Sequence, residues 1–248
     1  MEKSESISLR GLSLQQAALV AGFAYLLNPV PFAQIYALPR LIVDDASQTV
    51  ANMAAHPHLF ATAVLSLLFS ALGDIIMAWA LYVLLAPINR ALSLLASLLQ
   101  LVYAAVWLTA ISQLGLLYRL VVLSDYAKQV RATDLPLQAT ELLGGYRSGL
   151  GIGLILFGLH LVVIGWLIAH STYLPRWLGW LLFLDGWVWV ADNLSIYLFP
   201  QASVGYLKGL WAAELIFEVW LLGWGWRIRE PTSERRQFAT GTCSSPDE

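Results

Sequence analysis

Residues 148–169 read SGLGIGLILFGLHLVVIGWLIA, a run with one histidine and no carboxylate or cationic side chain. A stretch of about 18 or more apolar residues is long enough to cross a membrane as a helix. The whole chain has the same character, because 58% of its residues are hydrophobic and 12% are charged, whereas an ordinary soluble domain carries roughly 25% charged residues. The predicted fold class is therefore all-α, a polytopic transmembrane helix bundle in a lipid bilayer.

Apolar runs of similar length recur along the chain and predict about six spans. At a rise of about 1.5 Å per residue, each run covers a hydrocarbon core of roughly 30 Å. Asn28, Pro29 and Pro31 lie inside the first run and are expected to kink it. The predicted spans are residues 14–38, 59–85, 91–117, 148–169, 175–198 and 206–226.

The bundle is expected to occupy residues 14–228, between a polar N-terminal segment, 1–13, and a polar, disordered tail, 229–248. Two connections, 86–90 and 170–174, are short and lie on the side of the termini.

The long connections, 39–58 and 122–147, lie on the other side, and each is expected to contain a short amphipathic helix. Asp45 is the predicted cap of the first of these helices. Together the two long loops are expected to form a lid. Eight Lys and Arg residues lie on the side of the termini and six on the other, which favours cytoplasmic termini in the cell membrane.

Several segments resemble a known family. They read AGFAYL at 21–26, DASQTVANM at 45–53, LYVLLAPIN at 81–89, FGLH at 157–160 and STYLPRWLG at 171–179, and the last is the most specific. In this order they resemble the bacterial integral membrane family catalogued as domain of unknown function 4386. Gly186-Trp187 departs from the pattern of that family. The resemblance implies a multi-helix membrane fold and no particular activity.

Six ionisable residues lie inside the predicted spans. A charged side chain at the bilayer centre costs from about 3 to about 10 kcal/mol or more, so such residues usually face the bundle interior. No Lys or Arg lies deep in a span, so the acids are expected to be protonated or paired with His160, a loop arginine or a bound cation. The candidate intramembrane polar site is Asp74, His160, Asp185, Glu218, Asp192 and Glu214.

The rise per residue gives these residues two depths. Measured from the side of the long loops, Asp74, His160, Asp185 and Glu218 lie at roughly 18–22 Å. Asp192 and Glu214 lie at roughly 10–12 Å. Four ionisable groups on four spans at one depth favour a real polar site.

Glycines predict how the fourth span packs. Gly145, Gly149 and Gly153 recur at every fourth residue, which is typical of a close-packing helix face. His160 follows Gly153 by seven residues and is expected to point into the bundle. A structural interpretation stays open, in which His160 only bonds a neighbouring helix and Asp192 caps a helix or ends it early.

Three kinds of function remain open. The acids and His160 form a site for a proton, a cation or a small amphipathic ligand. Alternatively, buried carboxylic acids act in an intramembrane enzyme on an isoprenoid or lipid. In the third case the protein is a non-catalytic membrane component that binds lipid or a partner protein. Arg119 and Arg147 are the candidate mouth residues at interfacial depth.

Other classes find no support in the sequence. The net charge of −2 gives no indication of nucleic-acid binding, and Cys243 is the one cysteine. No nucleotide-binding, hydrolase or metalloprotease motif occurs, and no cofactor or resident metal is expected. His56 and His58, with Asp44 or Asp45, form a weaker metal candidate in the first long loop. The oligomeric state is not predicted.

Overall fold

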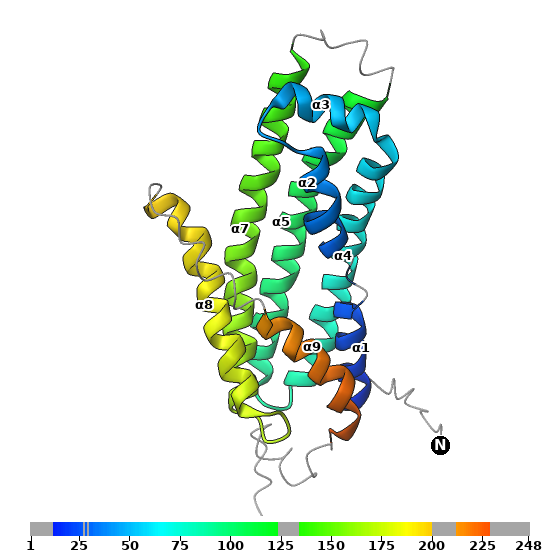
Figure 1. The fold of residues 1–248 in the computed structure, drawn as a ribbon. Coiled ribbons are helices and arrows are strands. Elements are labelled where there is room, and N and C mark those ends of the chain that lie inside the picture. The colour runs from blue at the N-terminus through cyan, green and yellow to red at the C-terminus, as the bar shows by residue number, and fades with distance from the viewer. Residues whose placement is uncertain (1–11, 27, 29, 124–133, 200–211, 229–248) are drawn as a thin grey trace, which may run out of the picture.

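The computed structural model describes residues 12–26, 28, 30–123, 134–199 and 212–228, and every element in these ranges is a helix (Figure 1). Four helices are long and apolar enough to cross a membrane. They are α4 (Pro57–Leu85), α5 (Arg90–Val122), α7 (Leu135–Ala169) and α8 (Arg176–Leu198). The prediction of an all-α membrane fold is therefore confirmed, with four spans supported by length and hydropathy.

Shorter helices complete the described part of the chain. They are α1 (Leu14–Leu26), η1 (Phe32–Ala37), α2 (Leu38–Leu41), α3 (Ala46–Ala55), α9 (Ala212–Trp224) and η3 (Gly225–Arg227).

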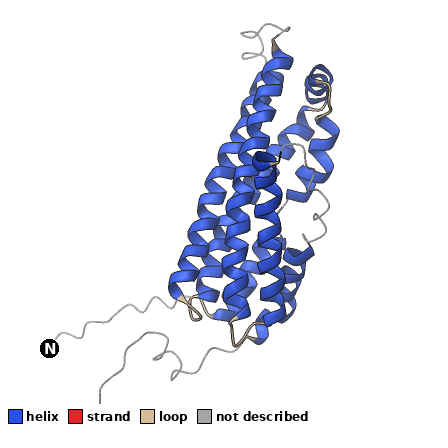
Figure 2. Ribbon diagram, turned by 90° about the vertical axis from the view of Figure 1, so that its left-hand side faces the viewer, coloured by secondary structure: helices blue, strands red, loops and turns tan. Residues whose placement is uncertain are grey.

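The long helices stand side by side (Figure 2). Helix α7 packs against α5 on one side and α8 on the other, while α4 packs against α5 and α1. Helix α9 contacts α1 and α8. The α4–α5 and α7–α8 turns lie at the same end of the bundle as the start of α1, and α3 lies across the opposite end (Figure 1).

The first predicted span is interrupted rather than kinked. Helix α1 ends at Leu26, and the chain resumes as the π-helical segment η1 and the short helix α2. Prolines lack the amide proton that would continue an α-helical ladder. At the break, the Asn28 side chain accepts a hydrogen bond from the backbone of Val30 at 3.1 Å. Farther along, Gln34 donates to the Tyr146 hydroxyl at 2.6 Å, which ties η1 to α7.

The prediction of a long loop over residues 122–147 is wrong in its second half. Helix α7 already begins at Leu135, with Pro136 in its first turn, where a missing amide proton costs no helical hydrogen bond. Helix α5 likewise continues to Val122. At about 1.5 Å per residue, α7 is roughly 50 Å long, so it extends well beyond a hydrocarbon core of roughly 30 Å.

The first long loop contains the expected helix and cap. Asp45 precedes α3, and its carboxylate accepts hydrogen bonds from the backbone of Ser47 at 2.8 Å and Gln48 at 3.3 Å. Thr49 and Met53 of α3 are buried, and the helix packs against α7 and α5. One predicted lid helix is thus present at the long-loop end. The second predicted lid segment lies partly in α7 and partly at 124–133, outside the described residues.

Glycines place α7 between its neighbours. A Cβ atom on Gly149 would lie 2.9 Å from the Ala110 Cβ, and one on Gly153 would lie 3.4 Å from the Tyr103 ring, so the predicted packing face meets α5. A second glycine face, which the sequence analysis missed, meets α8. A Cβ on Gly186 would lie 2.5 Å from the Gly158 carbonyl oxygen and 2.7 Å from the Val162 nitrogen.

Candidate functional site

Asp74 and Gln100 meet between α4 and α5. Both side chains are buried, and the Gln100 amide donates to Asp74 Oδ1 at 3.4 Å. Asp74 Oδ2 and Gln100 Oε1 have no hydrogen-bond partner within the described ranges. A buried polar group without a partner typically costs about 1–3 kcal/mol. In the described ranges, the surrounding helices therefore leave one oxygen of each side chain without a hydrogen bond.

His160 approaches the same part of α5 from α7. Its ring is fully buried, and Nδ1 lies 2.8 Å from the carbonyl oxygen of Ala96. Because a carbonyl only accepts hydrogen bonds, Nδ1 carries the proton and Nε2 of the neutral ring presents a lone pair. Among the described residues, nothing bonds Nε2. Ala96 precedes Gln100 by one helical turn, so His160 and Asp74 contact successive turns of α5.

Asp185 lies at the level of His160. Its neighbour Gly186 packs against Gly158 and Val162, two residues to either side of His160. The Asp185 side chain is 0% exposed, and neither carboxyl oxygen has a partner in the described part of the chain. Asp185 and His160 therefore lie at one level of the α7–α8 packing.

Three uncharged side chains extend the polar set and were missed in the sequence. The Tyr25 hydroxyl on α1 is buried without a partner among the described residues, and lies close enough to Glu214 and Asp74 to interact electrostatically. Ser70 lies one turn before Asp74 on α4, and its hydroxyl is likewise unpartnered in these ranges. Tyr103 follows Gln100 by three residues and interacts electrostatically with Asp74. For Ser70, the position one turn before Asp74 was the available sequence signal, whereas Tyr25 and Tyr103 are on other helices and had none.

The acids of α9 lie to one side of this set. Glu214 is half-buried and accepts a hydrogen bond from the Trp189 indole at 2.9 Å. It interacts electrostatically with Asp185 and, more weakly, with Asp74. Glu218 is buried and interacts with Tyr25. Both acids therefore lie near the polar set.

Asp192 stands apart from the buried acids. It is half-buried, and its backbone carbonyl accepts a hydrogen bond from Ser195 at 2.7 Å. Helix α8 continues to Leu198, as the predicted fifth span does, so the alternative in which Asp192 ends the helix early is wrong.

Phe157 connects the two halves of the site. Its ring lies 5.2 Å from Tyr103, 6.2 Å from His160 and 6.1 Å from Trp189, measured between ring centroids. Trp189 in turn bonds Glu214. Phe157 and Trp189 therefore link Tyr103 and His160 to the acid of α9 through a chain of contacts.

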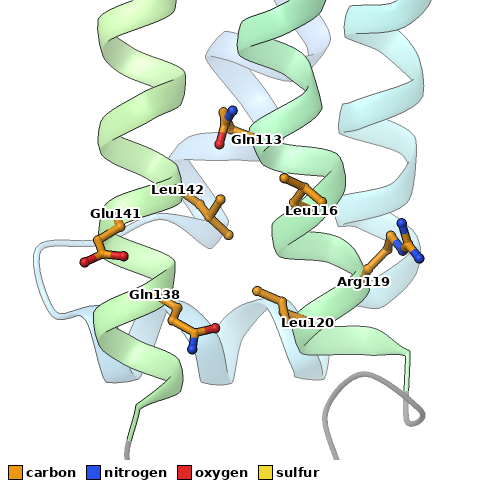
Figure 3. Close-up of a pocket in the computed structure, with 7 residues that line it drawn as sticks. All are labelled: Gln113, Leu116, Arg119, Leu120, Gln138, Glu141 and Leu142. Atoms are coloured by element: carbon orange, nitrogen blue, oxygen red, sulfur yellow. The ribbon is translucent and has the colours of Figure 1, made fainter. Parts of the chain in front are cut away.

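The two predicted mouth residues occupy different places. Arg119 and Arg147 are both exposed, on α5 and α7. Arg119 lines a groove of about 490 Å³ between these helices, together with Gln113, Gln138 and Glu141 (Figure 3). Arg147 is not part of that lining. The lining of this groove contains none of the buried acids or His160.

A second groove, of about 770 Å³, lies between α1 and α4. Its lining includes Ala24 and Gly73, the chain neighbours of Tyr25 and Asp74. Most of its lining is apolar, with Asn28, Thr62 and Ser66 as polar members.

A metal centre finds no support in the described residues, which contain no group of three His, Cys, Asp or Glu side chains that could hold an ion. The weaker candidate at His56 and His58 is therefore not supported as a three-ligand site.

Comparisons with known proteins identify a family. The model of the family described as "Domain of unknown function (DUF4386)" matches residues 20–225, which include all the candidate site residues. The chain is also similar to an uncharacterized protein of Archaeoglobus fulgidus, with 31% identity over 160 residues, which are 64% of this chain and 82% of that protein. No solved structure matches. As the resemblance predicted, the chain belongs to the DUF4386 family of unknown function.

Proposed function

We propose that this membrane protein binds and transfers a proton at Asp74 and His160. One observation carries the proposal: Asp74 Oδ2, His160 Nε2 and both Asp185 oxygens are buried without partners among the described residues. Intramembrane acids and histidines are costly and commonly belong to proton relays. A proton is the smallest species that these lone pairs accept.

The donor set favours a proton over a metal ion. Ca²⁺ takes about 6–8 oxygen ligands, and Mg²⁺ requires a near-octahedral set. The parts of the chain that the structure describes contain no group of three ligating acids or histidines. A proton needs one lone pair, and Asp74 and His160 each offer one.

The geometry of His160 suits a proton carrier. Protonation at Nε2 leaves the Nδ1 proton in place, so the hydrogen bond to Ala96 persists in both charge states. The ring therefore gains or loses a proton without leaving its place against α5.

Asp74 behaves differently, because the hydrogen bond from Gln100 is stronger to a charged carboxylate than to a neutral acid. Its protonation therefore weakens a contact between α4 and α5. This contact links proton binding to the packing of the two helices.

Infrared difference spectroscopy of the protein in lipid nanodiscs tests the proposal directly. A pH change should produce a carboxylic-acid band that disappears in Asp74→Asn and persists in Asp192→Asn, the matched control on a half-buried acid. Gln100→Leu removes the hydrogen bond to Asp74 and should move the band, even if Asp74→Asn folds poorly. A spectrum without a band that responds to Asp74 or Gln100 contradicts the proposal.

A second candidate function is an intramembrane enzyme on an isoprenoid or lipid, and the groove between α1 and α4 favours it. The lining of this groove includes Ala24 and Gly73, the chain neighbours of Tyr25 and Asp74, and a Cβ on Gly73 would meet only the Ala24 carbonyl oxygen within 4 Å, at an ordinary 3.5 Å. Gly73→Leu should therefore fill the groove without disturbing the helices. If it abolishes the conversion or binding of an apolar substrate while the Asp74 band stays unchanged, the enzyme is favoured over a simple proton relay.

We also propose six spans with both termini in the cytoplasm. Helix α1 and the segments η1 and α2 after it all pack against α4, which supports an interrupted first span. Helix α9 packs against α1 and α8 and supports a sixth span. Residues 14–228 then form the bundle, and an even number of spans returns the chain to its starting side.

Cys243, the one cysteine of the chain, tests this topology. A membrane-impermeant maleimide should leave Cys243 unlabelled in intact cells and label it after lysis. In a Cys243→Ser background, Glu141→Cys should be labelled in intact cells. Labelling of Cys243 from outside contradicts the proposed orientation.

A further inference from the structure

The groove between α1 and α4 opens toward lipid. Its lining comes from both helices and from Asn28, which follows the end of α1 at Leu26. Exposed apolar side chains on the spans of a membrane protein face the acyl chains, which are as apolar as they are. Five large apolar members of the lining are exposed, namely Phe23, Leu65, Phe69, Leu72 and Ile76.

The polar members of the lining lie toward the long-loop end. Helices α1 and α4 run in opposite directions, because α1 begins at the end of the bundle where α4 ends (Figure 1). A Cβ on Gly73 would lie 3.5 Å from the Ala24 carbonyl oxygen, so these two residues lie at one level. From that level toward the long-loop end, α4 passes Ser66 and then Thr62, and the other wall reaches Asn28. The groove therefore has one polar end and one apolar end.

The length of the groove matches one leaflet of the bilayer. From Thr62 to Ile76, α4 rises about 21 Å. Exposed Asn89 and Arg90 follow Leu85, the last residue of α4, so the hydrocarbon core begins near Leu85. Measured from there, Ile76 lies at roughly 14 Å and Thr62 at roughly 35 Å. In a core of roughly 30 Å, the groove thus runs from the head-group region to the middle of the bilayer.

The polar end offers hydrogen bonds without charge. The Thr62 hydroxyl donates to the His58 carbonyl at 2.7 Å and the Ser66 hydroxyl to the Thr62 carbonyl at 2.8 Å, so each hydroxyl oxygen is left as an acceptor. The Asn28 side-chain oxygen accepts from Val30, and its amide nitrogen has no partner among the described residues. None of the described residues of the lining is charged. A ligand head that both donates and accepts is therefore matched, and a phosphate or carboxylate is not.

We propose that this groove binds a single-chain lipid alcohol from the leaflet on the long-loop side. Its hydroxyl group donates to Thr62 or Ser66 and accepts from the Asn28 amide. Its chain follows α4 past Phe69 to Ile76. A charged head would lie unpaired at the edge of the hydrocarbon core, which is costly. The proposal rests on the groove of the second candidate function and names the substrate class of that enzyme, but binding itself requires neither conversion nor proton transfer.

Photolabelling of the full chain in phosphatidylcholine nanodiscs tests the site. One probe is hexadecanol with a diazirine at the far end of its chain, and the control is palmitic acid with the same diazirine, at a pH at which the acid is ionised. The alcohol should label the groove about fivefold more strongly than the acid, as one hydrogen bond of typical strength permits. Peptide mapping should place this label near Val20 or Ile76. A diazirine beside the hydroxyl should instead label near Thr62.

Variants separate the head contact from the chain contact. Thr62→Val keeps the shape of the side chain, removes a hydroxyl acceptor and should lower labelling by the alcohol about fivefold. Gly73→Leu fills the apolar end and should lower it as well. Thr109→Val is the matched control, because Thr109 is also exposed and also donates to a carbonyl four residues earlier, at 3.0 Å, but lies on α5 outside the groove. This control should be labelled as the wild type is.

Each other outcome has a distinct meaning. Equal labelling by the alcohol and the acid overturns the hydroxyl site, and this comparison uses the wild type and needs no variant to fold. Label outside α1 and α4, or an equal loss in Thr62→Val and Thr109→Val, overturns it too. Selective labelling without conversion of the alcohol supports the site and contradicts the enzyme. Both threonines are exposed, so their variants should fold, and gel filtration checks that they do.

Discussion

Helix α7 meets α8 and α5 through two interfaces that are built differently. Against α8, glycines bring the backbones together, and a Cβ on Gly165 would lie 2.5 Å from the Phe183 nitrogen and 2.8 Å from its Cα. Against α5, side chains fill the interface, and His160 reaches Ala96 beside the Asp74–Gln100 pair. At its glycines the first interface leaves no room for a Cβ atom, whereas the second contains His160 Nε2, a polar atom without a partner in the described ranges.

The difference separates a structural interface from a functional one. In a membrane, helices associate through close packing rather than through a hydrophobic drive, so the glycine contacts stabilise the α7–α8 pair. Unpartnered polar atoms do the opposite, because each costs stability. Natural proteins tolerate such costs mainly at functional sites. The α5–α7 interface is therefore where chemistry is expected.

The largest effect on stability is expected at the α7–α8 interface. Gly165→Val places a branched side chain against the backbone of Phe183, which should destabilise the protein by about 3 kcal/mol or more and prevent its isolation as a folded species. Gly144→Val is the matched control on the same helix, since its Cβ meets nothing within 4 Å. Unfolding in bicelles by a denaturing detergent compares the two. Equal stability of the two variants would show that the α7–α8 contact is looser than the structure has it.

A smaller effect, a gain rather than a loss of stability, is expected at Asp185. Asp185→Leu replaces two buried oxygens, unpartnered in the described chain, by an apolar group of similar size, and should stabilise the fold by about 1–3 kcal/mol. Asp185→Asn keeps a polar group and should change stability less. The same unfolding titration measures both. A large loss of stability in Asp185→Leu would mean that the carboxyl has a structural partner, and Asp185 would leave the functional set.

Features of the fold that depend on local periodicity could be predicted from the sequence. The long apolar runs predicted the membrane helices, and the four-residue glycine repeat predicted the face that α7 presents to α5. The inward direction of the His160 side chain follows from its spacing to the same repeat. The Asp45 cap needs only residues within one turn of it.

Features that depend on which helices meet could not be predicted. Gly158, Gly165, Gly179 and Gly186 are visible in the sequence, but their spacing does not say that α7 faces α8. Residues 135–147 include Pro136, Glu141 and Arg147, which are polar or helix-breaking, so they do not extend the apolar run of the fourth span. They fit a helix once α7 extends past the hydrocarbon core. Gln100, on a different helix from Asp74, carries no signal until the structure places the two side chains together.

The smallest effects concern glycines with and without room for a methyl group. Gly115→Ala on α5 should stabilise the protein by about 0.5–1 kcal/mol, because alanine restricts the unfolded chain and its Cβ meets nothing within 4 Å. Gly149→Ala should instead cost about 1 kcal/mol or more, since its Cβ would lie 2.9 Å from that of Ala110. Opposite signs in one unfolding titration would support an α5–α7 interface that is tight at Gly149. If Gly149→Ala also stabilises the protein, the helices separate there without cost, and the polar groups near His160 have more room than their packing indicates.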